Sequence, residues 1–223
     1  MSSVRSSVRL LVVTAVAAEA EALAGCGYDG YDVLVGGVGP AAAAAATATA
    51  LTRAPYGLVI SAGIGGGFQP LAPVGSLVVA DAIIAADLGA QTAEGFVPVD
   101  ELGFGRTTCL PPGKLSRAVA EATGAAYAPV LTVSTVTGTA ERAAELTARH
   151  PRAAAEAMEG FGVAEAAAAH GVPVLEIRAI SNSVGPRDRA AWQIGRALAA
   201  LTAAFRDLAP VIDTALDAWE PER

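Results

Sequence analysis

A short polar cluster at the end of an apolar run constrains the fold of this chain more than any other feature. Residues 172–186 open with apolar and β-branched side chains and stop at Gly185-Pro186, a pattern typical of a buried strand that ends in a loop. Arg178, Ser181 and Asn182 lie toward the carboxyl end of that strand, where ligands bind in open α/β sheets. A buried arginine is costly without an anion, so two interpretations stay open. The strand contributes to a binding site, or it is a core strand whose arginine pairs with a nearby carboxylate.

Apolar runs of strand length alternate with helical segments along the chain. We expect further strands at residues 9–16, 31–37, 57–62, 75–86, near 96 and at 129–134, and the run 75–86 is long enough to bend or bulge. We expect helices from residue 19, from residue 40, and over 114–123, 139–149, 157–169 and 187–217, with Thr139 as an N-cap. The alternation predicts an α/β fold, a single three-layer domain with a central twisted mixed β-sheet flanked by helices. This domain is expected to span residues 9–223, after a flexible leader at 1–8.

Composition and charge exclude several classes of protein. At 223 residues, with 53% hydrophobic and 17% charged residues, the chain suits one domain with a sizeable core. The apolar excess is mostly Ala and Val, and no run of about 18 strongly apolar residues predicts a membrane span. The net charge is −7 and Lys114 is the only lysine, so no basic patch for nucleic acid is visible. Because no secretory signal pattern opens the chain, we expect a cytoplasmic protein.

Cysteine and histidine are too sparse for most metal or nucleophilic sites. Cys26 and Cys109 lie far apart without a CxxC or histidine spacing, which predicts reduced thiols and no metal site. His150 and His170 each follow a predicted helix, where the favoured interpretation is a cation at the helix C-terminus. A catalytic triad that depends on histidine is therefore not expected.

Other candidate residues follow other predicted strands. Glu19 comes after the first strand and is either an acid in the first turn of a helix or a carboxylate that projects over the sheet edge. The glycine run 63–67 follows the third strand and predicts a loop that lets backbone N–H groups approach a ligand. It lacks the features of a Walker A or dinucleotide loop, so no cofactor is expected. Carboxylates with an amide and an arginine suit hydrolysis through a cationic sugar transition state.

Five short motifs resemble the purine nucleoside phosphorylase and nucleosidase superfamily. They are Thr14-Ala-Val-Ala-Ala-Glu19, Gly37-Val-Gly-Pro40, Ser61-Ala-Gly-Ile-Gly-Gly-Gly67, Met158-Glu159 and Arg178-Ala-Ile-Ser-Asn182. The chain is most similar to the 5′-methylthioadenosine/S-adenosylhomocysteine nucleosidases and, in that neighbourhood, to the futalosine hydrolases of menaquinone biosynthesis. The resemblance covers roughly residues 9–215 and implies an enzyme that hydrolyses an N-glycosidic bond without a cofactor.

The resemblance implies catalytic and sugar-binding roles for four residues. Glu19 corresponds to the acid that orients and deprotonates the attacking water, and Arg178 to an arginine near that water and Glu19. Glu159 corresponds to the carboxylate that holds the ribose hydroxyls, and Met158 to the residue that packs against the sugar.

The sequence departs from the methylthioadenosine enzymes in the site expected to bind the base. Gly65, Gly66 and Ser181 are expected to bind substrate, and Asn182 matches a residue that faces purine N7, which is Asp in the methylthioadenosine enzymes. An amide cannot donate an acid proton to N7, but it offers both a donor and an acceptor. Its NH₂ can bind O6 of a 6-oxopurine and its oxygen can accept N7–H, which suits hypoxanthine, the base of futalosine, better than adenine. The alternative is that Asn182 only caps the turn before Gly185.

Water is the expected nucleophile. A phosphorylase should carry arginines after the first and third strands to hold phosphate, whereas residues 15–19 and 63–67 contain none and Glu19 would repel phosphate. The alternatives kept open are a methylthioadenosine or S-adenosylhomocysteine nucleosidase, a purine nucleoside phosphorylase and a non-catalytic nucleoside-binding protein.

The expected partner is a small-molecule nucleoside, with no nucleic acid and no membrane, and the family resemblance suggests a homo-oligomer with a dimer favoured.

Futalosine carries an aryl carboxylate on its 5′ side. Arg187, Arg189 and Arg106 are candidates to meet this group, against the alternative that each is an ordinary solvent-exposed arginine.

Overall fold

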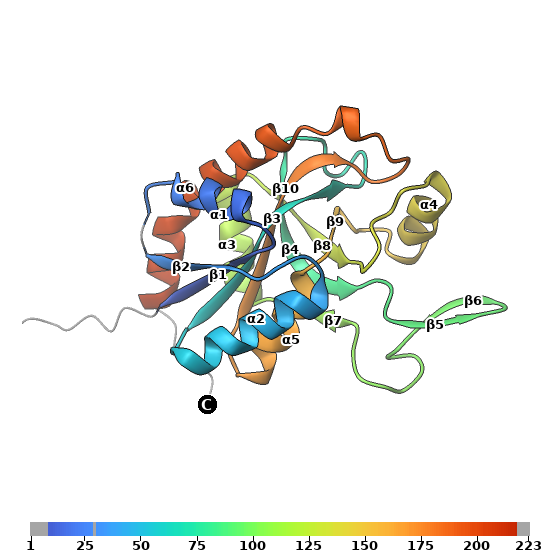
Figure 1. Cartoon of the computed structure of the whole chain (residues 1–223), viewed down its shortest axis with the longest axis horizontal. Coiled ribbons are helices and arrows are strands. Elements are labelled where there is room, and N and C mark those ends of the chain that lie inside the picture. Colours follow the sequence, from blue (N-terminus) through green and yellow to red (C-terminus); the bar gives the residue numbers. More distant parts are fainter. Residues whose placement is uncertain (1–8, 29, 218–223) are drawn as a thin grey trace, which may run out of the picture.

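A mixed β-sheet lies between two layers of helices in the computed structural model, which describes residues 9–28 and 30–217 (Figure 1). Sequence alternation predicted this three-layer α/β arrangement, and the prediction is confirmed. The expected leader at residues 1–8 lies outside the described residues. Within the described part of the chain, no helix is long and apolar enough to cross a membrane.

Five strands of the main sheet form a closed circuit. Strand β3 pairs with β10, β10 with β4, β4 with β8, β8 with β9, and β9 returns to β3. Beyond β3 the sheet continues through β1 to β2, and β7 adds to β4. The bounds are β1 Leu10–Thr14, β2 Tyr31–Val35, β3 Leu58–Gly67, β4 Leu77–Ala85, β7 Thr108–Cys109, β8 Ala126–Thr132, β9 Ala155–Ala157 and β10 Val174–Ser183. Because β1, β3 and β10 run parallel, their carboxyl ends lie at one edge of the sheet.

Each face of the sheet buries its own core against helices. Helices α1 (Ala17–Ala24), α3 (Gly113–Thr123) and α6 (Ile194–Asp217) cover one face through side chains such as Leu23, Val119 and Phe205. Helices α2 (Pro40–Arg53) and α5 (Gly160–Ala169) cover the other through small residues and Phe161. Helix α4 (Ala140–Arg149) packs separately by Leu146. Burial of apolar side chains on both faces accounts for the nearly continuous apolar strands.

Two local predictions are confirmed and one is extended. Thr139 caps α4, since its hydroxyl oxygen accepts a hydrogen bond from the Arg142 N–H. The long run after residue 75 forms β4, and its register against β8 shifts between Ala80 and Ile83, as expected for a bulge. The short strand expected near residue 96 is one arm of a hairpin, β5 (Gly89–Thr92) with β6 (Gly95–Pro98), which projects from the body of the molecule (Figure 1).

Three predicted boundaries are wrong. The glycine run 63–67 belongs to β3 instead of forming a loop, and none of these glycines has a positive φ. The segment expected to begin a helix at residue 157 forms β9 and a turn before α5 starts at Gly160, because pairing with β3 and β8 outweighs the helix propensity of Ala. The final helix begins at Ile194, after a short 3₁₀ turn at Arg189–Ala191 that the Asp188 side chain caps.

The two histidines lie at helix ends as predicted, but His150 does not suit a cation. His150 ends α4 and His170 ends α5. Burial, and then the neighbouring charge of Arg149, lowers the pKa of His150 below its usual value. This lowering of the pKa disfavours the positive charge that was expected for His150 at the helix C-terminus.

Candidate active site

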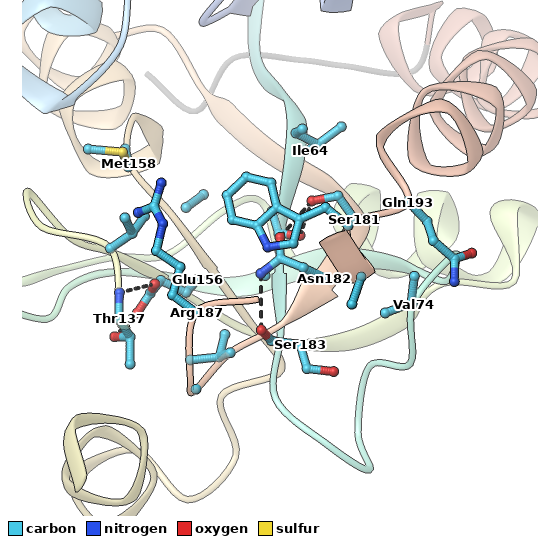
Figure 2. Close-up of a pocket in the computed structure, with 18 of the residues that line it drawn as sticks. Ile64, Val74, Thr137, Glu156, Met158, Ser181, Asn182, Ser183, Arg187 and Gln193 are labelled. Carbon is cyan, nitrogen blue, oxygen red and sulfur yellow. Dashed lines mark hydrogen bonds between the residues drawn. The ribbon is translucent and has the colours of Figure 1, made fainter. Parts of the chain in front are cut away.

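The carboxyl ends of β1, β3 and β10 open into a cavity of about 600 Å³, a volume suited to a small organic ligand. Seven of the eight residues predicted for the site line this cavity: Glu19, Gly65, Gly66, Met158, Glu159, Ser181 and Asn182. The eighth, Arg178, is 1% exposed and is not part of the lining. Segments far apart in the sequence therefore contribute to one hollow, part of which Figure 2 shows.

Three backbone N–H groups hold the Glu19 carboxylate. Its Oε2 accepts hydrogen bonds from the N–H of Ala15 (2.9 Å) and of Val16 (3.3 Å), so the side chain folds back over the start of α1. Its Oε1 accepts from the N–H of Ile64 on β3 at 2.8 Å. Glu19 is thus both an acid in the first turn of its helix and a carboxylate at the sheet edge that lines the cavity.

The glycines of β3 provide room for side chains from other elements. A Cβ at Gly63 would lie 2.5 Å from Oε1 of Glu19 and 2.9 Å from Nη1 of Arg178. A Cβ at Gly65 would lie 2.8 Å from the carbonyl oxygen of Glu156. All three distances are shorter than real Cβ contacts, so the strand needs glycine for space and not for an unusual φ.

Arg178 connects a core ion pair to the cavity. It lies in the middle of β10, where its Nε donates to Oε1 of Glu176 at 2.9 Å and its Nη2 donates to the Ser61 hydroxyl at 2.9 Å. Its Nη1 lies 3.4 Å from Oε2 of Glu159. Burial acts to lower the pKa of Arg178, but the carboxylates of Glu176, Glu159 and Glu19 raise it above its usual value. The guanidinium is therefore charged, and a buried ion pair occupies most of its donors. This agrees with the interpretation of Arg178 as a core arginine that pairs with a nearby carboxylate.

Glu159 points into the cavity instead of serving α5. It is the N-cap residue of that helix, but its side chain makes no cap hydrogen bond there. Its Oε1 accepts from the N–H of Gly39 at 3.2 Å and its Oε2 from the N–H of Met158 at 3.3 Å. These contacts and Arg178 fix a carboxylate that is 6% exposed.

The orientation of the Asn182 amide is set by its neighbours. Its Nδ2 donates to the carbonyl oxygen of Ser183 at 3.0 Å, and a carbonyl can only accept. Its Oδ1 accepts from the Ser181 hydroxyl at 2.8 Å, and that hydroxyl also lies 3.2 Å from the Gly65 carbonyl oxygen. One N–H and one lone pair of the amide stay available to a ligand in the cavity.

Sequence reasoning missed two buried carboxylates. Glu156 on β9 lines the cavity, and Thr137 donates to it from its backbone N–H at 2.8 Å and from its hydroxyl (Figure 2). Glu176 is fully buried beside Arg178, and burial raises its pKa against the opposing effect of that arginine. Each had a signal in the sequence: Glu156 is a lone acid among alanines, and Glu176 precedes Arg178 by two residues, the spacing of one strand face.

The three candidate arginines have different positions. Arg187 lines the cavity, with its guanidinium carbon 5.6 Å from the centre of the Trp192 ring. Arg189 lies 5.9 Å from the same ring but is not part of the lining. Arg106 donates to Glu165 at 2.6 Å beside a separate hollow.

A closed α/β sheet with a carboxylate-rich cavity at the carboxyl ends of its strands defines the nucleoside phosphorylase class of proteins. Comparison with known proteins agrees, because residues 12–217 match the model of the Phosphorylase superfamily. The chain is 69% identical over 198 residues to a futalosine hydrolase of Streptomyces coelicolor, covering 86% of this chain and 83% of that protein. It is 48% identical over 223 residues to a futalosine hydrolase of Acidothermus cellulolyticus, covering 91% of each.

Solved structures show the same fold. A 5′-methylthioadenosine/S-adenosylhomocysteine nucleosidase from Neisseria meningitidis matches with a TM-score of 0.76 at 22% identity, covering 92% of this chain and 99% of that chain. A futalosine hydrolase mutant from Helicobacter pylori matches with a TM-score of 0.75 at 17% identity, covering 95% and 100%. The chain belongs to the phosphorylase superfamily and, within it, to the futalosine hydrolase family. It is a nucleosidase, as the sequence motifs predicted.

Proposed function

We propose that this chain hydrolyses the N-glycosidic bond of futalosine, releasing hypoxanthine and dehypoxanthine futalosine as a step of menaquinone biosynthesis. The observation that carries the proposal is Asn182, an amide of fixed orientation in the same cavity as the Glu19 carboxylate. The names of the close relatives support the same substrate.

The base is held at Asn182. The free N–H of its amide donates to O6 of hypoxanthine, and its oxygen accepts N7–H once N7 is protonated. Because an amide is not an acid, the proton reaches N7 from solvent as the C1′–N9 bond lengthens. Ser181 keeps the amide in place through its hydrogen bond to Oδ1.

The ribose is held at Glu159, with Met158 packed against the sugar. A carboxylate with two oxygens accepts from two neighbouring hydroxyls, and its negative charge stabilises the cation that develops on the sugar. Arg178 holds the Glu159 carboxylate in position, since Nη1 lies 3.4 Å from Oε2.

Glu19 activates the water that captures C1′. Its contacts with the backbone N–H groups of Ala15, Val16 and Ile64 prevent the side chain from rotating away. A general base needs a fixed position within hydrogen-bond distance of the proton that it removes. Gly63 leaves the space that this carboxylate needs.

Water is favoured over phosphate as the nucleophile. Among the described lining residues Arg187 is the single cation, whereas three glutamates, Glu19, Glu156 and Glu159, line the same cavity. A phosphate would meet net repulsion there, because the charge of Arg178 is already matched by Glu176 and Glu159.

Arg187 is the proposed contact for the aryl carboxylate on the 5′ side of futalosine. It lines the cavity, and its guanidinium carbon lies 5.6 Å from the centre of the Trp192 ring, which favours a fixed position of the charge. Arg106 is engaged with Glu165 elsewhere and is not proposed for this role.

The experiment that tests the function is base release from futalosine and from methylthioadenosine, each with and without phosphate, analysed by chromatography. Hypoxanthine from futalosine, independent of phosphate, is the expected result. Adenine from methylthioadenosine alone would show that Asn182 does not select a 6-oxopurine, and dependence on phosphate would identify a phosphorylase.

We also propose that the chain forms a homo-oligomer, with a dimer expected from its family. Light scattering on the purified protein gives the mass directly, and a monomeric mass at micromolar concentration contradicts this proposal.

A further inference from the structure

Glu156 is a buried carboxylate in the cavity that the hydrolytic steps leave unused. It is 5% exposed, lies in the middle of β9 and belongs to the lining together with Asn182. Ionised groups are rarely buried without partners, because each loses its hydration. Among the described residues no arginine or lysine forms an ion pair with it.

Glu156 and Asn182 lie on the two strands that flank Gly66, on opposite sides of the space above this glycine. In the sheet register, Gly66 of β3 pairs with Asn182 on β10 and with Glu156 on β9. Residues paired across strands present their side chains to the same face, and strands lie about 4.8 Å apart, so the two Cα atoms flank Gly66 at a separation of about 10 Å. That spacing leaves room for a flat ring that is bonded on both sides.

The glycine between them keeps this gap open. A Cβ at Gly66 would lie 3.3 Å from Nδ2 of Asn182 and 2.9 Å from a methyl carbon of Val184. Any side chain at this position would therefore occupy the space beside the Asn182 amide. Figure 2 shows Glu156 with its hydrogen bond from Thr137 and Asn182 with its bond to Ser183 in the same hollow.

Thr137 holds Glu156 but does not saturate it. The backbone N–H of Thr137 donates to Oε1 and its hydroxyl donates to Oε2, so each oxygen has one partner. A carboxylate has about four acceptor positions, and two therefore stay open. Burial raises the pKa of Glu156 above its usual value, and the two Thr137 donors offset only part of this rise. An N–H from a ligand would complete the set of partners that an ionised, buried carboxylate requires.

We propose that Glu156 accepts a hydrogen bond from N1–H of the base and so makes this site selective for 6-oxopurines. This inference rests on the proposed function, since it assumes that the base lies against Asn182. A 6-oxopurine carries hydrogen on N1 and donates to the carboxylate. A 6-aminopurine has a lone pair at N1, which would face the carboxylate oxygen with no proton between them. Such a buried mismatch costs on the order of 10²-fold or more in kcat/KM.

The test compares two substrates that differ only at the base, futalosine and its 6-amino analogue. In Glu156→Gln the amide oxygen must take the Oε1 position, because the backbone N–H of Thr137 can only donate. The NH₂ then takes the Oε2 position, from which it presents an N–H to N1 of the 6-aminopurine and a donor instead of an acceptor to N1–H of futalosine. We expect kcat/KM for futalosine to fall on the order of 10²-fold, and that for the 6-amino analogue to stay constant or rise. Glu121→Gln, on the exposed surface of α3, is the matched control and should change neither value. An equal loss on both substrates would mean that Glu156 acts only on structure and would overturn the inference.

A second measurement needs no variant. Calorimetry with the wild-type protein should show hypoxanthine binding on the order of 10²-fold more tightly than 1-methylhypoxanthine, which has no N1–H to donate. Equal affinities would overturn the role of Glu156 even if Glu156→Gln does not fold. Failure of the wild-type enzyme to release hypoxanthine from futalosine would instead overturn the proposed function, and the free-base measurement would then judge Glu156 separately.

Discussion

The backbone N–H of Ile64 donates a hydrogen bond to Oε1 of Glu19 at 2.8 Å, and so joins β3 to the first turn of α1. The two residues are 45 positions apart in the sequence. With Ala15 and Val16 on the other oxygen, this contact leaves the carboxylate a single position. A side chain fixed in this way is suited to orienting one water molecule, because little conformational freedom is lost when substrate binds.

Glu19→Gln should lower kcat for futalosine by about 10²–10⁴-fold, since that is the usual contribution of a general base. The amide cannot accept the proton of water, but it matches the carboxylate in size and can still accept from Ile64. The fold should survive, so circular dichroism and the melting temperature check integrity beside the rate. Glu21→Gln on the same helix is the control, because Glu21 is exposed. Turnover near the wild-type value would remove Glu19 from the mechanism.

Gly63→Ala should lower kcat/KM by about 10²-fold or more, because the new Cβ would displace the two groups on which the site depends. That Cβ would lie only 2.5 Å from Oε1 of Glu19 and 2.9 Å from Nη1 of Arg178. Gly113→Ala offers a matched control at the start of α3, where a Cβ meets nothing within 4 Å. If Gly63→Ala and Gly113→Ala have the same activity, the two side chains can move aside and the close approach does not matter.

Arg187→Ala should raise KM for futalosine by about tenfold or more and leave inosine turnover unchanged, because only futalosine carries the aryl carboxylate. Arg189→Ala, near the same tryptophan but outside the lining, should have the smaller effect. Steady-state kinetics on both substrates separate the two residues. Equal changes in KM for futalosine and inosine would mean that Arg187 shapes the cavity without contacting the carboxylate.

Much of this site could be predicted because its residues come from strand ends with recognisable patterns. The apolar run that ends at Gly185-Pro186 predicts that Asn182 lies at a strand end, and the first apolar run predicts the same for Glu19. The glycines 63–67 were misread as a loop because local propensity cannot reveal that Glu19 and Arg178 approach them from elsewhere. Glu156 was missed for a similar reason, since its position depends on β9 pairing with both β3 and β8. Pairing between distant segments overrides the helix propensity of the surrounding alanines.

His150 should make stability depend on pH in a defined interval. Its imidazole is partly buried at the end of α4, and Nε2 has no hydrogen-bond partner among the described residues. Burial and Arg149 lower the pKa of His150 in the folded state, whereas an unfolded chain has a histidine pKa of about 6.5. Below about pH 6.5 the unfolded state therefore binds more protons than the folded state, so stability is lost as pH falls from that value through the folded pKa. Above that interval this histidine is neutral in both states and contributes no slope.

His150→Gln should remove this contribution, and urea unfolding between pH 7.5 and 5 measures it. The wild-type protein should lose more stability over that interval than the variant, because other titrating groups are common to both. His170→Gln provides the same change of residue type at the exposed end of α5. Parallel pH profiles for wild type and His150→Gln would show that the imidazole is hydrated or paired in the folded state, since only an uncompensated buried histidine resists protonation in this way.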